Sequence, residues 1–402
     1  MEEYRTYRLG DIAECTLGKM LDQKKNKGKP HVYLGNVAVR WGAFNIDPSQ
    51  AMRFEDKEIE KFQAVKGDII LCEGGEPGRC AIWEDDEPIC IQKALHRIRV
   101  DQSIASPYYV YYYLTSFVKS GKAEPYFTGS TIKHLPRERL ISLELTLPCL
   151  DEQKRRARII QSLDAKISLN NRINHNLEEQ AQALYKSWFV DFEPFKGGKF
   201  VDSELGMIPE GWRVAELGTV TRQSSQKVKD RIDVKVLSPV TTGELVLSEE
   251  YFTKQVFSES ISKYIVVKPL HFAYNPARVN IGSIGMNMFS FDGCVSPVYV
   301  VFECEKGYHH FFDYYRKTES FKDEVLNRAI GGVRQTLSYK DFALIKLVYP
   351  PYDIVEKFNC IYAGLLENKN SIKREISKLS ELRDTLLPKL LSGELKIDDF
   401  TC

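Results

Sequence analysis

The feature that most constrains the fold of this chain is an internal repeat with a period near 200 residues. When the sequence is shifted by 202 positions, residues 129–135 fall on residues 331–337, and Pro148 falls on Pro350. The identity between the two halves is low, but the same features occur twice in the same order, with a small insertion near the start of the second half. Self-similarity at a fixed period indicates a repeated structural unit. The sequence therefore predicts a tandem duplication of one domain.

A long helix is predicted after each half, because apolar or small side chains recur there at alternating three- and four-residue spacing. The seam of these helices contains Ile160, Leu163, Ile167, Leu177, Leu184 and Trp188 after the first half, and Leu365, Ile372, Ile376, Leu379, Leu386 and Leu390 after the second. A seam kept for four heptads is typical of a coiled coil. We expect the helices to pair antiparallel, with Ile160 close to Leu390 and Trp188 close to Tyr362. The alternative is that each helix packs on its own domain.

The part of each half that precedes its helix is predicted to be a mixed α+β domain. Short runs rich in β-formers, such as residues 68–72 and 96–100, are separated by glycine-containing turns. The aromatic stretches 108–113 and 311–315 are expected on helices packed against these sheets. The fold class is thus α+β: two similar mixed α/β domains joined by two long antiparallel coiled-coil helices, in a pseudo-twofold tandem repeat. The expected bounds are 1–150 for the first domain, 151–192 for the central helix, 193–350 for a linker and the second domain, and 351–402 for the C-terminal helix.

No motif in the sequence forms a convincing catalytic site. The chain has no glycine-rich phosphate loop of the kind that binds nucleoside triphosphates. The segment Tyr349–Tyr352 is similar to the catalytic loop of amino-methyltransferases. Its first residue, however, is tyrosine, whose side chain has no carbonyl oxygen to accept a hydrogen bond from the target amino group. We interpret it as the end of a strand and the start of a helix. The pair His309 and His310 is expected on a helix beside Phe311 and not at a metal. These observations argue against an enzyme.

Composition and charge narrow the function further. The chain has 56 basic and 55 acidic residues, and the segments 1–150 and 191–350 are each balanced. A protein that binds DNA without partner subunits usually has more basic than acidic residues, because its affinity comes largely from neutralising phosphates. Any DNA-binding surface must therefore be a local patch, or a partner must supply much of the phosphate contact. No run of 18 apolar residues and no signal peptide is found, and the nine cysteines are scattered, so we expect a cytoplasmic protein with reduced cysteines and no membrane partner.

Three segments carry a family resemblance in addition to the repeat. They are residues 182–189 (QALYKSWF), 202–212 (DSELGMIPEGW) and 382–395 (LRDTLLPKLLSGEL). With the two-half layout, they make the chain resemble the specificity subunit of type I restriction-modification enzymes over essentially its whole length. The resemblance implies that the two domains are target-recognition domains, each reading one half of a split site in double-stranded DNA, with the helices as spacer.

The same resemblance implies partners and cofactors. The partners would be methylation subunits that use S-adenosylmethionine and restriction subunits that translocate DNA with ATP and Mg²⁺. These cofactors would belong to the partners, and none is expected in this chain, which would be non-catalytic by itself. Two alternatives stay open: a specificity subunit of a type II methylation and cleavage assembly, and a scaffold protein without a DNA role.

Candidate DNA-contact residues are taken from loops that carry groups able to read base edges or contact phosphates. Two matched loops follow glycines at equivalent places in the halves, and two further arginines are expected on exposed turns. The candidates are Lys133, His134, Arg334, Gln335, Arg79 and Arg278.

Overall fold

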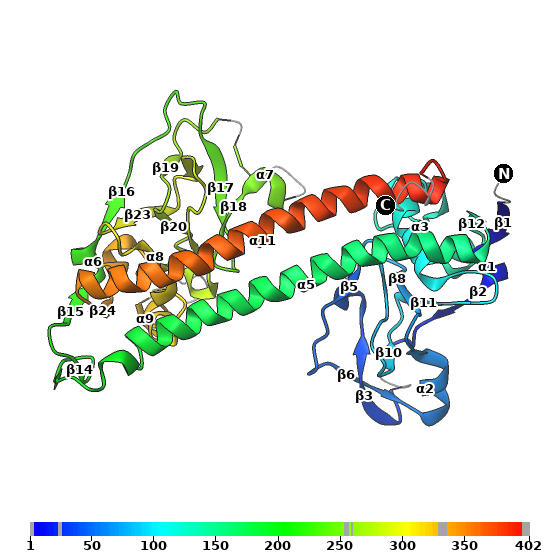
Figure 1. Cartoon of the computed structure of the whole chain (residues 1–402), viewed down its shortest axis with the longest axis horizontal. Helices are drawn as coiled ribbons and strands as arrows, with labels where there is room; N and C mark the ends of the chain where they lie inside the picture. Colours follow the sequence, from blue (N-terminus) through cyan, green and yellow to red (C-terminus); the bar gives the residue numbers. More distant parts are fainter. Residues whose placement is uncertain (1–3, 23–25, 253–256, 259, 329–335, 396–402) are drawn as a thin grey trace. The chain divides into compact units, whose positions relative to one another are not determined.

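The computed structural model describes residues 4–22, 26–252, 257–258, 260–328 and 336–395. The chain forms two compact units. Unit 1 contains residues 1–172 and 373–402, and unit 2 contains residues 173–372. Two long helices, α5 (Leu150–Phe189) and α11 (Tyr352–Ser392), each contribute to both units (Figure 1).

Unit 1 is built from two four-stranded sheets and a separate strand pair. The pair joins β1 (Arg5–Arg8) to β12 (Glu144–Leu147). The first sheet has the order β6 (Ala51–Phe54), β3 (Lys29–Leu34), β10 (Ile89–Ile91) and β7 (Gln63–Ala64). The second has the order β2 (Ala13–Leu17), β11 (Leu95–Val100), β8 (Ile69–Cys72) and β9 (Cys80–Ile82). The other elements are α1 (Leu9–Ile12), η1 (Asn36–Ala38), β4 (Val39–Arg40), β5 (Ala43–Phe44), α2 (Asp56–Phe62), α3 (Pro107–Lys119), η2 (Glu124–Tyr126) and α4 (Arg137–Ile141).

Unit 2 contains the same arrangement. Its strand pair joins β15 (Arg213–Glu216) to β24 (Lys346–Tyr349). One sheet has the order β18 (Leu245–Leu247), β17 (Lys235–Pro239), β22 (Gly293–Val295) and β19 (Ile265–Val267). The other has the order β16 (Thr221–Ser224), β23 (Val300–Cys304), β20 (Phe272–Tyr274) and β21 (Ile284–Met286). The other elements are η3 (Glu193–Phe195), β13 (Phe200–Val201), β14 (Ile208–Pro209), α6 (Leu217–Val220), α7 (Ser248–Tyr251), η4 (Val279–Ile281), α8 (His309–Tyr315), α9 (Glu319–Arg328) and α10 (Tyr339–Phe342).

The predicted duplication is confirmed strand by strand. The order β6-β3-β10-β7 in unit 1 corresponds to β18-β17-β22-β19 in unit 2, and β2-β11-β8-β9 corresponds to β16-β23-β20-β21. The parallel pair lies at the same place in both units, between β3 and β10 and between β17 and β22. The starts of β12 and β24, and those of α5 and α11, are separated by the same 202 positions that align the halves of the sequence.

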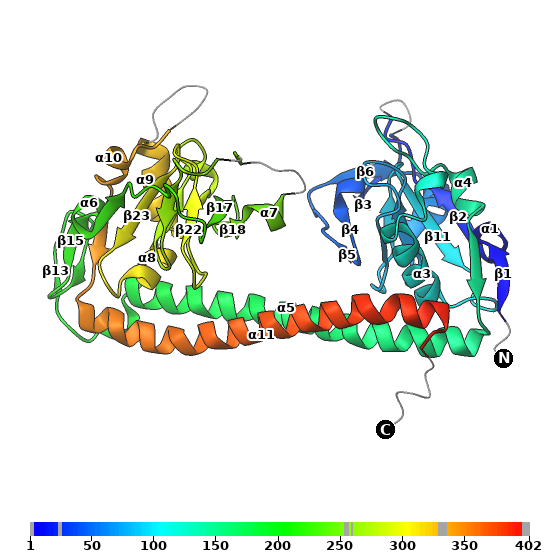
Figure 2. The same ribbon diagram turned by 90° about the horizontal axis from the view of Figure 1, so that it is seen from above.

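The predicted antiparallel pairing of the long helices is present within each unit. In unit 1 the start of α5 meets the end of α11, because Arg156 Nη1 donates to the backbone oxygen of Leu390 at 2.9 Å. Further along α5, Asn170 Nδ2 donates to Glu375 Oε2 at 2.9 Å. The two helices run side by side there in both views of the ribbon (Figures 1 and 2). Ile160 and Leu390 belong to one hydrophobic core.

Unit 2 holds the other ends of the same helices. Trp188 and Tyr362 belong to its core, and the ring of Trp188 lies 6.4 Å from that of Phe358 on α11. All the apolar seam positions named from the sequence are buried or half-buried. The first turns of α5 and α11 carry acidic residues and their last turns carry lysines, a distribution that stabilises a helix through its dipole.

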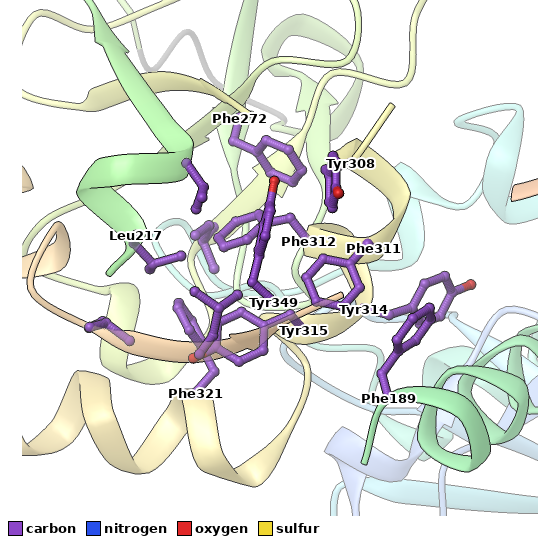
Figure 3. Packing of buried hydrophobic residues seen from close by; sticks show 14 of the residues in the cluster. Phe189, Leu217, Phe272, Tyr308, Phe311, Phe312, Tyr314, Tyr315, Phe321 and Tyr349 are labelled. Carbon is purple, nitrogen blue, oxygen red and sulfur yellow. The ribbon is translucent and has the colours of Figure 1, made fainter. Parts of the chain in front are cut away.

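The aromatic stretches lie on helices packed against sheets, as predicted. In unit 1, α3 buries Tyr109, Val110 and Leu114. In unit 2, α8 places its aromatic side chains against rings from the sheet and from α5, including Phe272 and Phe189 (Figure 3). No helix in the described ranges is both long enough and apolar enough to cross a membrane.

Candidate nucleic-acid interface

Three loops of unit 1 meet on one surface, and two of them were selected from the sequence. We call this surface face 1: the turn at residues 35–38, the β8–β9 loop at residues 73–79, and the loop at residues 128–135. The backbone amide of Leu135 donates to the backbone oxygen of Glu73 at 2.7 Å, and isolated β-bridges join His134 to both Gly74 and Thr128. Main-chain contacts therefore hold the second and third loops together, whereas the turn at residues 35–38 is joined to the β8–β9 loop through side-chain hydrogen bonds.

The predicted residues Lys133 and His134 both lie on face 1 and are exposed. Lys133 forms an ion pair with Glu124, so its charge is partly neutralised. The ring of His134 lies over Gly74, where an added Cβ atom would come within 2.7 Å of Nδ1. A larger residue at position 74 would displace the ring of His134 from this position.

A buried histidine holds the loop at residues 128–135 from the interior of unit 1. His96 lies on β11 and its Nε2 is 2.9 Å from the backbone oxygen of Leu135. Since that oxygen can only accept, Nε2 carries the proton of the neutral ring. Burial lowers the pKa of His96, which keeps the ring in this neutral form. Sequence reasoning missed this residue because its partner lies 39 residues away, and nothing in the local pattern signals the contact.

Arg79 differs from its sequence-based description as an exposed-loop residue. Its side chain is only 16% exposed and forms an ion pair with Glu76, at 2.7 Å between Nη1 and Oε2. Its Nη2 donates to the backbone oxygen of Asn36 at 3.2 Å and to Oδ1 of the same residue at 3.1 Å. The sequence could not reveal Asn36, which lies 43 residues earlier in the chain.

Unit 2 presents an equivalent surface, face 2, which in the described residues consists of the β17–β18 loop, the β20–β21 loop and the segment Thr336–Leu337. The amide of Leu337 donates to the backbone oxygen of Pro276 at 3.0 Å, which repeats the contact between Leu135 and Glu73. Arg278 is exposed on the β20–β21 loop, and its guanidinium has no ion-pair or hydrogen-bond partner among the described residues. Arg334 and Gln335 lie outside the described residues.

A buried ion pair supports face 2. Arg316 follows α8 and pairs with Asp313, at 2.6 Å between Nη2 and Oδ1. Its guanidinium also donates to the backbone oxygens of Ile284 at 3.0 Å and Gly243 at 2.7 Å. Burial opposes ionisation of Asp313, but the neighbouring Arg316 and Lys317 hold its pKa below the usual value. The side chain thus joins α8, β21 and the β17–β18 loop.

The residues that were weighed as catalytic or metal-binding candidates have structural surroundings. Tyr349 ends β24 and Tyr352 begins α11, as expected for a strand end followed by a helix. His309 and His310 lie on α8 beside Phe311, and the ring of His310 packs 4.8 Å from that of Tyr362. Within the described ranges, no three histidine, cysteine, aspartate or glutamate side chains are grouped so that they could hold a metal ion.

Comparison with known proteins identifies the family. The family model described as the type I restriction modification DNA specificity domain matches residues 1–179. The MjaIX type I restriction enzyme specificity subunit of Methanocaldococcus jannaschii is 26% identical over 345 residues, which cover 83% of this chain and 79% of that protein. The HindI type I restriction enzyme specificity subunit of Haemophilus influenzae is 23% identical, and the alignment covers 98% of this chain and 100% of that protein.

These matches support a specificity subunit of the type I restriction-modification kind. The fold agrees, because the crystal structure of the S subunit of a type I restriction-modification system from M. genitalium aligns over 97% of this chain and 96% of its own, with a TM-score of 0.55 and 17% identity. This specificity subunit is therefore a non-catalytic member of its system. The type II and scaffold alternatives find no support in these matches.

Proposed function

We propose that this specificity subunit reads a bipartite site in double-stranded DNA, with face 1 contacting one half-site and face 2 the other. The observation that supports the proposal is that the described residues of both units join equivalent loops in the same way, through Leu135 with Glu73 and Leu337 with Pro276, but carry different side chains on these loops. Two readers with a shared scaffold and different surfaces would recognise two different half-sites. Base edges in the major groove give each base pair a distinct pattern of donors and acceptors, which exposed loop side chains can read.

We further propose that the subunit acts within a complex of methylation and restriction subunits. Its net charge of +1 supports this, because the described faces carry few free cations that could neutralise phosphates. Those partners would hold S-adenosylmethionine, ATP and Mg²⁺. The purified chain alone is then expected neither to methylate nor to cut DNA. A dependence of cleavage on ATP in the reconstituted complex would separate a type I from a type II assembly.

The proposal is tested by methylation profiling of the reconstituted complex on a library of randomised sites. Replacing Arg334 and Gln335 with Ala should relax one half-site by about 5- to 150-fold per lost base-edge contact and leave the other readable. Arg278→Ala should act on the same half-site as these changes. A matched control is Arg222→Ala, because Arg222 is exposed on β16 of the same unit but forms an ion pair with Glu303. Equal loss at both half-sites would contradict independent readers, and an unchanged profile would remove the mutated residues from the interface.

A further inference from the structure

We propose that Arg79 is a positioning residue for face 1: it fixes the arrangement of the reading loops and thereby controls recognition of one half-site without itself contacting DNA. The inference rests on the proposed function, since it names the residue on which the reading geometry of unit 1 depends. It also assigns a different role to an arginine whose position in a glycine-rich turn suggests a direct DNA contact.

The first argument is the geometry of the guanidinium group. Its two terminal nitrogens meet three acceptors: Glu76 Oε2 at 2.7 Å, Asn36 Oδ1 at 3.1 Å and the Asn36 backbone oxygen at 3.2 Å. Glu76 lies on the same loop as Arg79, whereas Asn36 lies on the turn that follows β3. A planar group with several fixed donors suits such a set of acceptors, and an ammonium group at the end of a flexible chain does not.

The second argument is that each partner of Arg79 continues the network. Asn36 Nδ2 donates to the backbone oxygen of Gly74 at 2.6 Å, and Gly74 forms the β-bridge with His134. The other oxygen of Glu76 accepts from Trp41 Nε1 at 2.9 Å, and Lys119 lies over the Trp41 ring. One side chain therefore joins the turn after β3, the β8–β9 loop and, through Gly74, the loop that presents His134.

The third argument is that unit 2 makes the same link with another residue. Arg79 directly precedes β9, and Ser283 directly precedes the equivalent strand, β21. Ser283 Oγ donates to the backbone oxygen of Pro239 at 2.8 Å. By the register of the parallel strand pairs, Pro239 is the counterpart of Asn36, since Cys90 lies opposite Tyr33 and Cys294 lies opposite Val236. A neutral hydroxyl serves in unit 2, so the shared feature is the link between the loops and not a positive charge.

A direct phosphate or base contact would require Arg79 to leave this network. The departure would strip acceptors on Asn36 and Glu76 of their donor, and unsatisfied polar groups in a partly buried site are costly. The charge of Arg79 is also balanced by Glu76, which leaves little net attraction for a phosphate. Arg278 of face 2 has no such partner, so the two arginines should behave differently on mutation.

The test compares Arg79→Lys with Arg79→Ala in the reconstituted complex, by methylation profiling on randomised sites at several salt concentrations. For a positioning role, both variants should lose discrimination at half-site 1 by about 10-fold or more, with an unchanged salt dependence. For a phosphate contact, Arg79→Lys should resemble the wild type, and Arg79→Ala should weaken binding to all sequences and flatten the salt dependence. That result, or an unchanged profile in both variants, would overturn the proposal.

Asn36→Ala provides an independent variant. Because Asn36 and Arg79 act through one network, the double variant Asn36→Ala with Arg79→Ala should lose little more discrimination than either single variant. Additive losses would mean separate roles and would overturn the proposal. Denaturant unfolding followed by tryptophan fluorescence reports whether unit 1 of each variant has folded, since this unit contains Trp41 and Trp83. Arg278→Lys with Arg278→Ala gives the matched pair on an arginine that has no side-chain partner among the described residues. If the wild-type complex itself shows no bipartite site, the proposed function fails, whatever these variants do.

Discussion

The sheet β2-β11-β8-β9 of unit 1 and the equivalent sheet β16-β23-β20-β21 of unit 2 carry very different side chains at matching positions. In unit 1, Ile98 of β11 lies opposite Ile69 of β8. In unit 2, Phe302 of β23 lies opposite Phe272 of β20, and the two rings stack with centroids 5.2 Å apart. Rings from α8, including Phe312, lie close to Phe272 (Figure 3), and the ring of Phe342 on α10 lies 5.0 Å from that of Phe302. The same position of the ladder therefore holds an aliphatic pair in unit 1 and an aromatic pair in unit 2, although α3 also brings tyrosines such as Tyr109 into the core of unit 1.

This difference shows which part of the sequence specifies the fold. The strands β8 and β20 are buried at every position, so each is marked as a core strand by its continuous run of apolar residues. The identity of each apolar residue matters less, provided that the neighbouring side chains compensate for the change in volume. Low identity between the halves is consistent with one shared topology for that reason. The energetic consequences, however, should differ between the units.

The largest expected effect comes from truncating the aromatic core. Phe302→Ala should lower the unfolding free energy of unit 2 by about 3–5 kcal/mol, because it leaves a cavity among rings that cannot all move inward. Ile98→Val, the mildest truncation at the equivalent position of unit 1, should cost about 0.5–1.5 kcal/mol. Denaturant unfolding followed by tryptophan fluorescence measures both. Similar costs at the two positions would mean that the aromatic core has no special dependence on shape.

The next effect concerns the ionic contacts that attach each domain to its helices. Glu178 on α5 accepts from Lys317, Lys369 and Tyr314, whereas Asp164 on α5 accepts from Arg383 and Tyr112. Glu178→Gln should cost about 1–3 kcal/mol, since it leaves Lys369 without a counter-charge and Lys317 with Asp313 alone. Asp164→Asn should cost less, because Arg383 keeps Asp384 as a partner.

The ionic contact of Glu178 can be recognised by its pH dependence. Burial alone would raise the pKa of Glu178, but Lys317 and Lys369 outweigh it and lower the pKa to about 2 from an ordinary value of 4.5. The folded state therefore binds this proton less readily than the unfolded state. The stabilisation is fully present above pH 4.5 and is lost as the pH falls towards 2. The difference in unfolding free energy between wild type and Glu178→Gln should shrink over that range, and a constant difference would contradict the ionic explanation.

A smaller effect is expected from the histidines of α8. Burial, with a contribution from His309, lowers the pKa of His310 from 6.5 to about 4. Unfolding releases a ring that takes up a proton more readily, so unit 2 should lose about 1–2 kcal/mol as the pH falls from 6.5 to 4. His310→Phe keeps a ring beside Tyr362 and should flatten the stability curve in this range. An equally steep curve in the variant would exclude His310 as the cause.

The smallest effect distinguishes two matched tyrosines. Tyr112 Oη donates to Asp164 at 2.8 Å, but its counterpart Tyr314 lies 3.4 Å from Glu178. Tyr112→Phe should therefore cost about 0.5–1.5 kcal/mol, and Tyr314→Phe should cost less. Thermal unfolding of the two variants provides the comparison, and a larger cost for Tyr314→Phe would show that the shorter distance does not determine the strength of the contact.

The long helices and the duplicated order of strands were predictable from the sequence, because they depend on local periodicity. The spacing of Ile160, Leu163 and Ile167 and the equivalent spacing on α11 report the buried stripe directly. Strand positions such as residues 69–72 and 95–100 follow from runs of β-formers between turns. The boundaries of these two runs agree to within one residue, since the run expected at residues 68–72 forms β8 from Ile69 to Cys72.

The contacts of the recognition faces were much less predictable. Arg79 and Arg278 look alike in the sequence, because each lies in a turn between two strands of the same sheet. Only the fold shows that Arg79 meets Asn36 while Arg278 has no partner among the described residues. Such pairings are non-local and polar, and neither periodicity nor turn composition encodes them. The residues that link the loops, including Asn36, His96 and Ser283, carried no signal that sequence reasoning could use.

Unit 1 is built from two separate stretches of the chain, and this affects the order in which the two units can fold during synthesis. Leu387 and Leu390 complete its core, and Tyr109 donates to the backbone oxygen of Leu391. All of unit 2 is therefore synthesised before unit 1 has its last core residues. At roughly 5–20 residues per second, the nascent chain carries an incomplete first core for a few seconds after the second is ready to fold. During that interval the uncovered apolar surface of unit 1 is a target for chaperones, and a ribosome that stalls late would release a chain in which only unit 2 can fold.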